Sequence, residues 1–522
     1  MKRIAKILAC LTIGLVIACD DTQDPGPAEL QVQSTAEDLV GLLPSSTLAA
    51  AEFLNIDSRW SELRALPPLA RLQDHVLSGL GLDADDVPAI AGSHAILALL
   101  EDESRRIVPI ALLDPASPTD ARQRLAESDD LVTVAARGAV WVGPAAHTRL
   151  VERTAAGDGT SLRKSIDFGL LARHLPAGGL VRVVLNPRAL SAWLRRWAEY
   201  EGRSLARPLA QLFAADFEMV ELAGFRRDIV DGQLMTDGWV GFASDVIPEA
   251  VTRALATERG PALLPAQLPG DAMLAKSFRT EPEAGLAWLR SVAERDPQGP
   301  LRNLDFWIAE FEARSGRDIE TDIVGALGDR GLLLLLEGEA GAPELVAILD
   351  THDSERLVAA LIDLRGWLAE QIRGRSLGLA QPRPRDAAGA RGVVHGLDVW
   401  SPVGTLSGPV FQIVDDHLVV ATSGRSLNVG VELARAASTW TTPVWALAEG
   451  PPDEIAVVQL GALAGLLFEG STHPFDGTVW SQPLAEFLAS TEEGRLRVFY
   501  EDGGFRINGG LRITAAEPGG LP

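Results

Sequence analysis

An internal duplication is the feature that most restricts how this chain of 522 residues can fold. Four blocks from the first half of the chain recur in the second half, in the same order. The matching pairs are 86–101 with 322–337, 108–114 with 344–350, 180–185 with 455–460, and 231–242 with 502–513. Because chance seldom preserves the order of several matching blocks, the sequence predicts two copies of one folding unit.

Each copy combines paired apolar runs with single helical segments. In the first copy, Ala95–Leu100 and Ile107–Leu113 are apolar runs of strand length on either side of a charged turn. A second pair of runs surrounds Arg137 and Gly138, and the Asp-Gly pair at 231–232 predicts a third hairpin. Hairpins mixed with helices predict an α+β fold, with two tandem repeats of a largely antiparallel sheet and packed helices.

The matching blocks and the N-terminal pattern divide the chain into five predicted segments. They are a lipoprotein signal peptide at 1–18, a flexible tether at 19–36, repeat unit 1 at 37–260, repeat unit 2 at 261–515, and a tail at 516–522. The offset between matching blocks grows after 344–350, so the second copy contains an insertion. We place this insertion at about 374–396, where Pro382, Pro384 and several Gly and Arg predict a loop.

The N-terminus has the pattern of a secretory signal peptide. Lys2, Arg3 and Lys6 form a basic start, and an apolar run over 7–18 follows. This run is shorter than the roughly 20 residues that a membrane-spanning helix needs. The next stretch, 20–36, is polar, contains several Asp and Pro, and has no periodicity, which predicts a flexible tether.

Residues 16–19 (VIAC) resemble the lipobox of bacterial lipoproteins. The resemblance implies that Cys19 is diacylated on its sulfur, becomes the first residue of the mature chain, and anchors an exported protein to a membrane of the cell envelope. Asp20 and Asp21 resemble a signal that retains lipoproteins in the inner membrane of enteric bacteria. That rule differs between bacterial groups, so the sequence leaves open which membrane and which face carry the anchor. A plain cleaved signal with a chance cysteine is the alternative interpretation.

Charge and cysteine content exclude several classes of function. The formal net charge is −24, from 47 Lys and Arg against 71 Asp and Glu. Nonspecific nucleic-acid binding needs a basic surface, so the sequence predicts no nucleic-acid partner. Signal cleavage removes Cys10 and leaves Cys19 as the only thiol, which excludes a disulfide framework, a cysteine nucleophile and a zinc–thiolate site.

Motifs of catalysis and cofactor binding are missing from the sequence. It contains no Walker A loop, no dinucleotide-binding glycine pattern after a strand, and no His-Glu-x-x-His motif. The Gly-x-Ser-x-Gly pattern occurs once, at 374–378 (GRSLG), within the predicted insertion loop and not between a strand and a helix, where a serine hydrolase places its nucleophile. Residues 350–353 (DTHD) and 415–417 (DDH) are acidic clusters with a histidine, but their positions favour turn and helix-cap roles. Asp83–Asp86 lacks the glycine and the glutamate of a calcium loop. The sequence therefore predicts no catalytic, cofactor-binding or metal-binding residue, and one lipidation site at Cys19.

Leu43–Ala49 (LPSSTLA) and 408–423 resemble motifs of an uncharacterised family of bacterial extracytoplasmic proteins. The resemblance covers about residues 38–515 and implies no catalytic residue. We interpret the chain as a lipid-anchored, non-enzymatic envelope protein whose duplicated module binds a partner protein or forms envelope structure. Two alternatives stay open at this point: a carrier of an apolar ligand or lipid in a curved-sheet groove, and a divergent enzyme.

Overall fold

The computed structural model describes the chain from Leu39 to Ile513 with several gaps. The gaps are 66–69, 72, 75–82, 104–106, 127, 129–130, 158–159, 176–178, 201–205, 231–232, 258–259, 280, 296–300, 339–342, 376–382, 390–391, 399–408, 448, 463–490 and 502. The signal peptide, the tether with Cys19 and the C-terminal tail predicted from the sequence lie outside the described residues.

The chain divides into two compact units. Among the described residues, unit 1 contains those up to Val246, together with 491–496, 501 and 503–513. Unit 2 contains Ile247–Ala462 and Arg497–Tyr500. These compact units are defined by packing, whereas the repeat boundaries at 260 and 261 were drawn from sequence matches, so the two divisions need not coincide.

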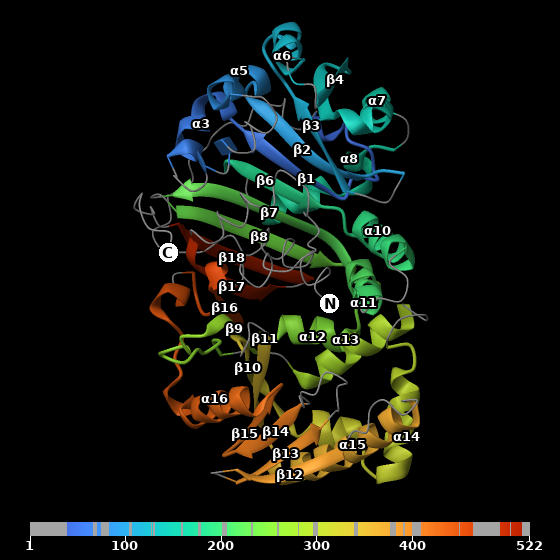
Figure 1. Cartoon of the computed structure of the whole chain (residues 1–522), viewed down its shortest axis with the longest axis vertical. Helices are drawn as coiled ribbons and strands as arrows, with labels where there is room; N and C mark the ends of the chain where they lie inside the picture. The colour runs from blue at the N-terminus through green and yellow to red at the C-terminus, as the bar shows by residue number, and fades with distance from the viewer. Residues whose placement is uncertain are drawn as a thin grey trace. The chain divides into compact units, whose positions relative to one another are not determined.

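The sheet of unit 1 has the strand order β4-β5-β3-β2-β1-β6-β7-β8, and its strand pairs are antiparallel (Figure 1). The strands are β1 Ala49–Leu54, β2 His94–Glu101, β3 Ile107–Leu113, β4 Leu131–Ala136, β5 Ala139–Pro144, β6 Val181–Leu185, β7 Val220–Val230 and β8 Gln233–Phe242. The predicted hairpins are confirmed, because β2 pairs with β3, β4 with β5, and β7 with β8. Alternate residues of the strands are buried on the two faces, which is why the apolar runs fold as buried strands.

Helices cover both faces of this sheet. Their bounds are α3 Ile56–Arg64, α5 Val87–Ala91, α6 Pro118–Leu125, α7 Thr148–Ala156, α8 Leu162–Ser165, α9 Phe168–His174, α10 Pro187–Tyr200 and α11 Ala206–Met219, with short 3-10 turns at Ala84–Asp86 and Ala145–His147. Helices α7, α8 and α9 pack on the face that contains Ala50 and Ile96. On the other face, α3, α5 and α6 pack near Ala95, while α10 and α11 pack near Ala49 and Phe225.

The sheet of unit 2 has the order β12-β13-β14-β15-β11-β10-β9-β16, again with antiparallel pairs. Its strands are β9 Ala272–Arg279, β10 Leu327–Glu337, β11 Pro343–Thr351, β12 Arg383–Gly389, β13 Gly392–Asp398, β14 Val410–Val414, β15 His417–Ala421 and β16 Glu454–Val458. Of the last two strands, β17 Thr491–Glu501 contributes Arg497–Tyr500 to unit 2, and β18 Gly504–Ile513 belongs to unit 1.

Helices pack on both faces of the sheet of unit 2. Its helices are α12 Glu249–Ala256, α13 Pro282–Arg295, α14 Leu304–Ser315, a π-helical turn Ile319–Val324, α15 Ser354–Arg375, α16 Gly424–Arg435, and 3-10 turns at Ala437–Thr439 and Val444–Leu447. Helix α16 packs on the face that contains Leu332 and Ile348, and α15 packs on the other face near Leu418. Helices and large antiparallel sheets together confirm the predicted α+β class.

Six strands occur in the same order in both sheets. The order β4-β5-β3-β2-β1-β6 of unit 1 corresponds to β14-β15-β11-β10-β9-β16 of unit 2. The pairing registers agree as well, because Ile96 lies opposite Glu52 where Leu332 lies opposite Ser277. By this register, positions in β1 and β2 have defined equivalents in β9 and β10.

Within the predicted insertion at about 374–396, the expected loop is wrong for the part that the structure describes. Residues 383–389 and 392–398 form the hairpin β12–β13, which extends the edge of the unit 2 sheet by pairing with β14. Proline usually indicates a loop, but Pro384 lies in the outermost strand, where a missing backbone N–H costs no ladder hydrogen bond.

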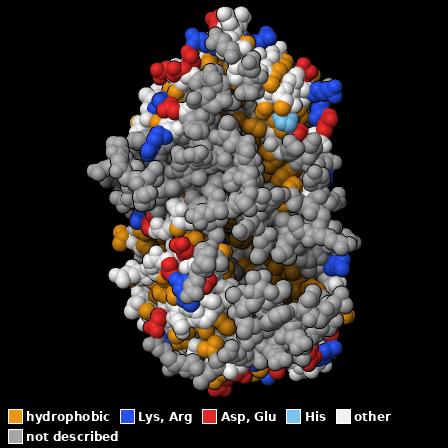
Figure 2. Space-filling view, in the orientation of Figure 1, with side chains coloured by type: hydrophobic (Ala, Val, Ile, Leu, Met, Phe, Trp, Pro, Cys, Tyr) orange, Lys and Arg blue, Asp and Glu red, His pale blue; other side chains and the backbone are white. Residues whose placement is uncertain are grey.

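Among the described residues, no helix is long and apolar enough to cross a membrane. On the face shown in Figure 2, acidic and basic side chains of the coloured residues are interspersed rather than gathered by sign.

Candidate functional site

A cavity of about 210 Å³ lies at one end of the sheet of unit 2, and we call it the sheet-end cavity. Strands β9, β10, β11 and β15 and the segment that follows α16 form its wall. Its apolar lining includes Leu263 and Trp440. Its charged lining residues are Arg279, Arg330 and Asp350, with His417 beside them. Apolar walls with a few convergent polar groups are typical of ligand sites.

Asp350 is the shared partner of two basic side chains on the cavity wall. His417 Nε2 lies 3.2 Å from Asp350 Oδ1, and Arg330 Nε lies 2.5 Å from Asp350 Oδ2. Burial alone would raise the pKa of Asp350, but hydrogen bonding to His417 and the positive charge of Arg330 outweigh burial and lower that pKa from its usual 3.8. Asp350 is therefore ionised near neutral pH, and both of its oxygens are already engaged.

Three nitrogens of the cavity residues are buried without a hydrogen-bond partner among the described residues. They are Arg279 Nε, Trp440 Nε1 and His417 Nδ1. Arg279 uses another nitrogen, Nη2, for an ion pair 3.2 Å from Asp329 Oδ2. These nitrogens are shielded from solvent, and nitrogens of the same kind occur away from this cavity, at Trp239, Trp367 and His94, so they do not by themselves mark a ligand site.

Strand register and one turn place these side chains together. Asp350 lies directly opposite His417, and Arg279 lies directly opposite Arg330. The turn at Asp415, with φ of 50°, makes His417 the first residue of β15. The sequence prediction of a hairpin turn at 415–417 is confirmed. The same turn places His417 on the wall of the cavity.

Gly328 packs directly against Asp350, with no space for a larger side chain at position 328. A Cβ at position 328 would lie 2.6 Å from the Cβ of Asp350, which is closer than real Cβ contacts. In unit 1, Gly92 lies against the backbone of Asp114, because a Cβ at position 92 would lie 2.1 Å from the Asp114 carbonyl oxygen, and its φ is 73°. A glycine therefore lies beside the strand-end acid in both units, but it faces the backbone in unit 1 and the side chain in unit 2.

Unit 1 has a different polar cluster at the equivalent end and face of its sheet, which we call the Glu52 cluster. Glu52 is 1% exposed, accepts a hydrogen bond from Arg182 Nε, and has its Oε1 3.7 Å from His94 Nε2. Burial would raise the pKa of Glu52, but His94 and Arg182 outweigh burial and lower that pKa from its usual 4.5. By register, His94 is the equivalent of Arg330, and Glu52 is the equivalent of Ser277.

A second cavity of about 210 Å³ lies in unit 1, and its charged groups are already paired. Arg137 Nη1 donates to the carbonyl of Leu42 at 3.1 Å, and Glu101 accepts from Arg196. Because these groups bind each other or the backbone, this cavity has a weaker chemical signal for a ligand than the sheet-end cavity.

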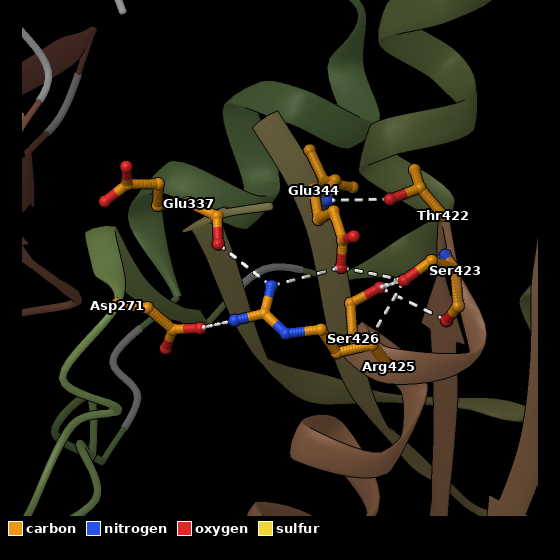
Figure 3. Close-up of polar contacts among 8 residues, drawn as sticks. Asp271, Glu337, Glu344, Thr422, Ser423, Arg425 and Ser426 are labelled. Carbon is orange, nitrogen blue, oxygen red and sulfur yellow. Dashed lines mark hydrogen bonds and ion pairs between the residues drawn. The ribbon is translucent and has the colours of Figure 1, made fainter. Parts of the chain in front are cut away.

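The polar network at the start of α16 is a helix cap. Figure 3 shows Ser423, Ser426 and Arg425 turned toward Glu344 and Asp271. Ser423 Oγ accepts the Ser426 N–H at 3.1 Å and donates to Glu344 Oε2 at 2.7 Å. The capping box satisfies orphan N–H groups of the helix, so these contacts are explained by folding alone.

Other acidic residues singled out in the sequence have the cap and turn roles predicted for them. Asp353 Oδ1 accepts the N–H of Arg356 at 3.1 Å at the start of α15. Asp83 accepts the N–H of Asp85 at 2.9 Å. In the described part of the chain, no group of three or more His, Cys, Asp and Glu residues could hold a metal ion.

The sequence interpretation missed Asp350 and His417 as a pair. Each was assigned alone to a turn or cap, because the two residues lie in blocks far apart in the chain. Their pairing needs the β11–β15 register, which the sequence does not specify. One signal was present in the sequence: His417 follows the turn in unit 2, whereas Ala139 follows the turn at Arg137 and Gly138 in unit 1.

No family model, no curated protein and no solved structure matches this chain.

Proposed function

We propose that the protein is an exported, lipid-anchored binding protein of the cell envelope that holds a small ligand in the sheet-end cavity of unit 2. The observation that carries the binding proposal is the cavity itself, on whose wall Arg330, Asp350 and His417 converge beside apolar side chains. Apolar walls with a few convergent polar groups are the usual form of a small-ligand site.

The membrane anchor is supported by the sequence at residues 16–19 and by the tether that follows. Replacing Cys19 with Ala in the native host should abolish incorporation of labelled palmitate and release the chain from the membrane fraction. A Cys10→Ala chain is the matched control, because Cys10 leaves with the signal peptide. Unchanged palmitate labelling in the Cys19→Ala chain would refute lipidation at this residue.

The duplication is supported by the six-strand order and by the equal registers at Ile96 and Leu332. We propose that both units descend from one ancestral module. In this account only the second copy has the sheet-end cavity as its binding site, since the first copy fills the equivalent region with the Glu52 cluster.

Carrying an apolar lipid has less support as a function of this chain than binding a small polar ligand. Cavities that bury a drug-sized ligand usually measure roughly 300–1,000 Å³, and the sheet-end cavity is about 210 Å³. Its wall also contains two arginines and one ionised carboxylate. These features favour a small ligand with a polar group over an acyl chain.

One observation favours a second candidate, a divergent enzyme. Asp350 holds His417 through Nε2 while Nδ1 is unpartnered, an arrangement that suits a general base. No hydroxyl of the described residues forms a hydrogen bond with His417 Nδ1, so a base-activated nucleophile of the chain has no support. Turnover in a hydrolase screen that disappears in His417→Gln but persists in Arg314→Gln would replace the binding proposal.

A ligand-observed NMR screen tests the binding proposal directly. A fragment set that includes acidic, basic and neutral compounds should contain binders for the mature chain, and Trp440→Phe should weaken those binders at the sheet-end cavity. Fragments that bind equally to the wild type and to Trp440→Phe, or no binding at all, would refute the proposed function.

A further inference from the structure

We infer that the outer edge of strand β4 in unit 1 pairs with the same edge of a second copy of this chain. This inference is independent of the ligand proposed for the sheet-end cavity of unit 2. It follows from which sheet edges are covered, which backbone groups of β4 face outward, and how this strand differs from the edge strand of unit 2.

Strand β4 lies at one end of the sheet of unit 1, where it pairs with β5 (Figure 1). Within the described part of the chain, no strand pairs with its other side. All residues of Leu131–Ala136 are half-buried or exposed, whereas residues 139–143 of the neighbouring β5 are all buried. An open strand edge of this kind is a template for pairing with another chain.

The hairpin turn decides which backbone groups of β4 face outward. The two turn residues, 137–138, have positive φ, so Ala136 and Ala139 form a hydrogen-bonded pair at the base of the turn. Hydrogen-bonded and non-hydrogen-bonded pairs alternate along an antiparallel ladder. Thr133 and Ala135 therefore direct their N–H and C=O groups away from β5, toward the outer edge.

The equivalent edge of unit 2 is already covered by a strand. Counted from the hairpin turn at 415–416, Phe411 of β14 is the equivalent of Thr133. Phe411 lies opposite His395 of β13, with the two ring centroids 5.1 Å apart. The shared module therefore accepts an antiparallel strand at this edge, and the described part of unit 1 supplies none.

The outermost strands of the two sheets differ in their protection against pairing. Strand β12, at the edge of unit 2, has the sequence RPRDAAG, with a proline and three charged residues. Strand β4 has the sequence LVTVAA, with neither. Because proteins use charges and prolines to keep edge strands from pairing with other chains, β4 has the composition of a strand that pairs.

A second copy fits this edge better than a lone peptide does, because of the helices beside it. In unit 2, the added strands β12 and β13 contact α15, whose 22 residues are about 33 Å long. In unit 1, the equivalent helix α6 has 8 residues and is about 12 Å long. A lone peptide would extend beyond this short helix, whereas a second copy brings its own α6 and α7, which contact its own β4.

The two outward residues define the register of the pair. The Leu131 N–H already donates to the carbonyl of Ser128 at 3.4 Å, so the pair centres on Thr133 and Ala135. Thr133 of each copy lies opposite Ala135 of the other, which forms four backbone hydrogen bonds around a two-fold axis. Val134 lies on this axis, and the Cα atoms of its two copies are about 4.5 Å apart.

Sedimentation velocity of the mature Cys19→Ala chain tests the pairing. The contact is small, so we expect a monomer–dimer equilibrium with a dissociation constant on the order of 100 µM, measured between about 5 and 300 µM. Thr133→Pro removes an outward N–H and places a ring at the edge, so it should weaken dimerisation at least tenfold. Thr133→Ala is the matched control, because it keeps the N–H and should dimerise like the wild type.

A cysteine on the two-fold axis gives a second readout that needs no proline. The mature chain without Cys19 has no thiol, so Val134→Cys introduces a single cysteine. The expected Cα separation lies in the roughly 4.4–6.8 Å range of disulfides, so mild oxidation should cross-link the dimer. Val393→Cys, at an exposed position of β13, is the matched control and should give at least tenfold less cross-linked dimer.

Three results would overturn the inference, and none of them affects the ligand site of unit 2. The first is a chain that stays monomeric over this concentration range. The second is a dimer that forms equally in a folded Thr133→Pro chain and in the wild type. The third is a Val134→Cys chain that cross-links no more than Val393→Cys. If circular dichroism shows that Thr133→Pro does not fold, the comparison of the two cysteine variants decides.

Discussion

The two sheet ends of this molecule use similar residues for different purposes. In unit 1, Glu52 is 1% exposed and is held by Arg182 and His94 within the core. In unit 2, Asp350 is 18% exposed and holds Arg330 and His417 on the wall of a cavity. Both clusters contain one acid, one arginine and one histidine on equivalent faces of their sheets.

The difference teaches that an acid, a histidine and an arginine in contact do not by themselves identify a ligand site. The Glu52 cluster lies in the core, and both ring nitrogens of His94 are buried there without a hydrogen-bond partner among the described residues. The Asp350 cluster lines a cavity, and His417 Nδ1 is likewise without such a partner. Surrounding volume, rather than residue type, separates a structural ion pair from a binding wall.

The largest expected effect comes from Glu52→Gln, which removes the charge and keeps the shape of the side chain. Removing one partner of a buried ion pair leaves the other charge uncompensated, so the free energy of opening at the β1 amides should fall by about 3 kcal/mol. Native-state hydrogen exchange measures this change locally. The control Glu62→Gln removes a half-exposed partner of Arg59 and should cost less than about 0.5 kcal/mol.

The same variant has a pH signature. Because the folded-state pKa of Glu52 lies below its usual 4.5, the unfolded state binds more protons than the folded state as the pH falls. The stabilisation from Glu52 is therefore complete above about pH 5 and is lost as the pH falls through the lowered pKa. Glu52→Gln should flatten this acid-side slope at the β1 amides, and an unchanged slope would contradict the structural role.

Gly328→Ala sharpens the comparison in unit 2. Its Cβ would lie 2.6 Å from the Cβ of Asp350, so β10 and β11 must shift, at a cost of about 2 kcal/mol. Gly366→Ala lies inside α15 with open space around the new Cβ and should stabilise by about 0.5–1 kcal/mol. Hydrogen exchange in β10 compared with α15 distinguishes the two. Equal effects of the two variants would contradict the contact at Asp350.

Asp350→Asn and Asp114→Asn compare the equivalent strand-end acids. Asp350→Asn should cost about 1–1.5 kcal/mol at the β11 amides, because it removes the charge that Arg330 and His417 face. Asp114→Asn should cost less than about 0.5 kcal/mol, the range for a surface change with no special partner. Equal losses in the free energy of opening for the two variants would contradict the proposed difference between the two strand ends.

The smallest effects concern helix caps. Ser423→Ala removes an acceptor for the Ser426 N–H at 3.1 Å and a hydrogen bond to Glu344, at about 1 kcal/mol. Ser117→Ala removes a longer contact, 3.4 Å from the Asp120 N–H, and should cost about 0.5 kcal/mol. Helix-specific hydrogen exchange in α16 and α6 checks the order. The reverse order would show that the Glu344 contact adds nothing.

The sequence predicts the elements of this fold better than their arrangement. Apolar runs and the turn at Arg137 and Gly138 predict the hairpin β4–β5, whose two turn residues have φ of 58° and 80°. The sequence does not predict the hairpin β12–β13, because the prolines in this segment usually indicate a loop. An edge strand tolerates proline, so the segment can still form a hairpin. Sheet order depends on long-range pairing, which local patterns do not encode.

The candidate site was less predictable than the fold. Asp350 and His417 are visible in the sequence, but each has a sufficient local explanation at a strand end or a turn. Trp440 reads as one apolar residue among twelve tryptophans. Only the register of β11 with β15, and the volume beside them, brings these residues into one site.

A crystal of the mature chain soaked with 4-bromobenzoate tests the central claim most directly. The Cys19→Ala change keeps this chain free of lipid for crystallisation. We expect a bromine anomalous peak in the sheet-end cavity beside Leu263 and Trp440. Bromine found only outside this cavity would contradict the proposed binding site.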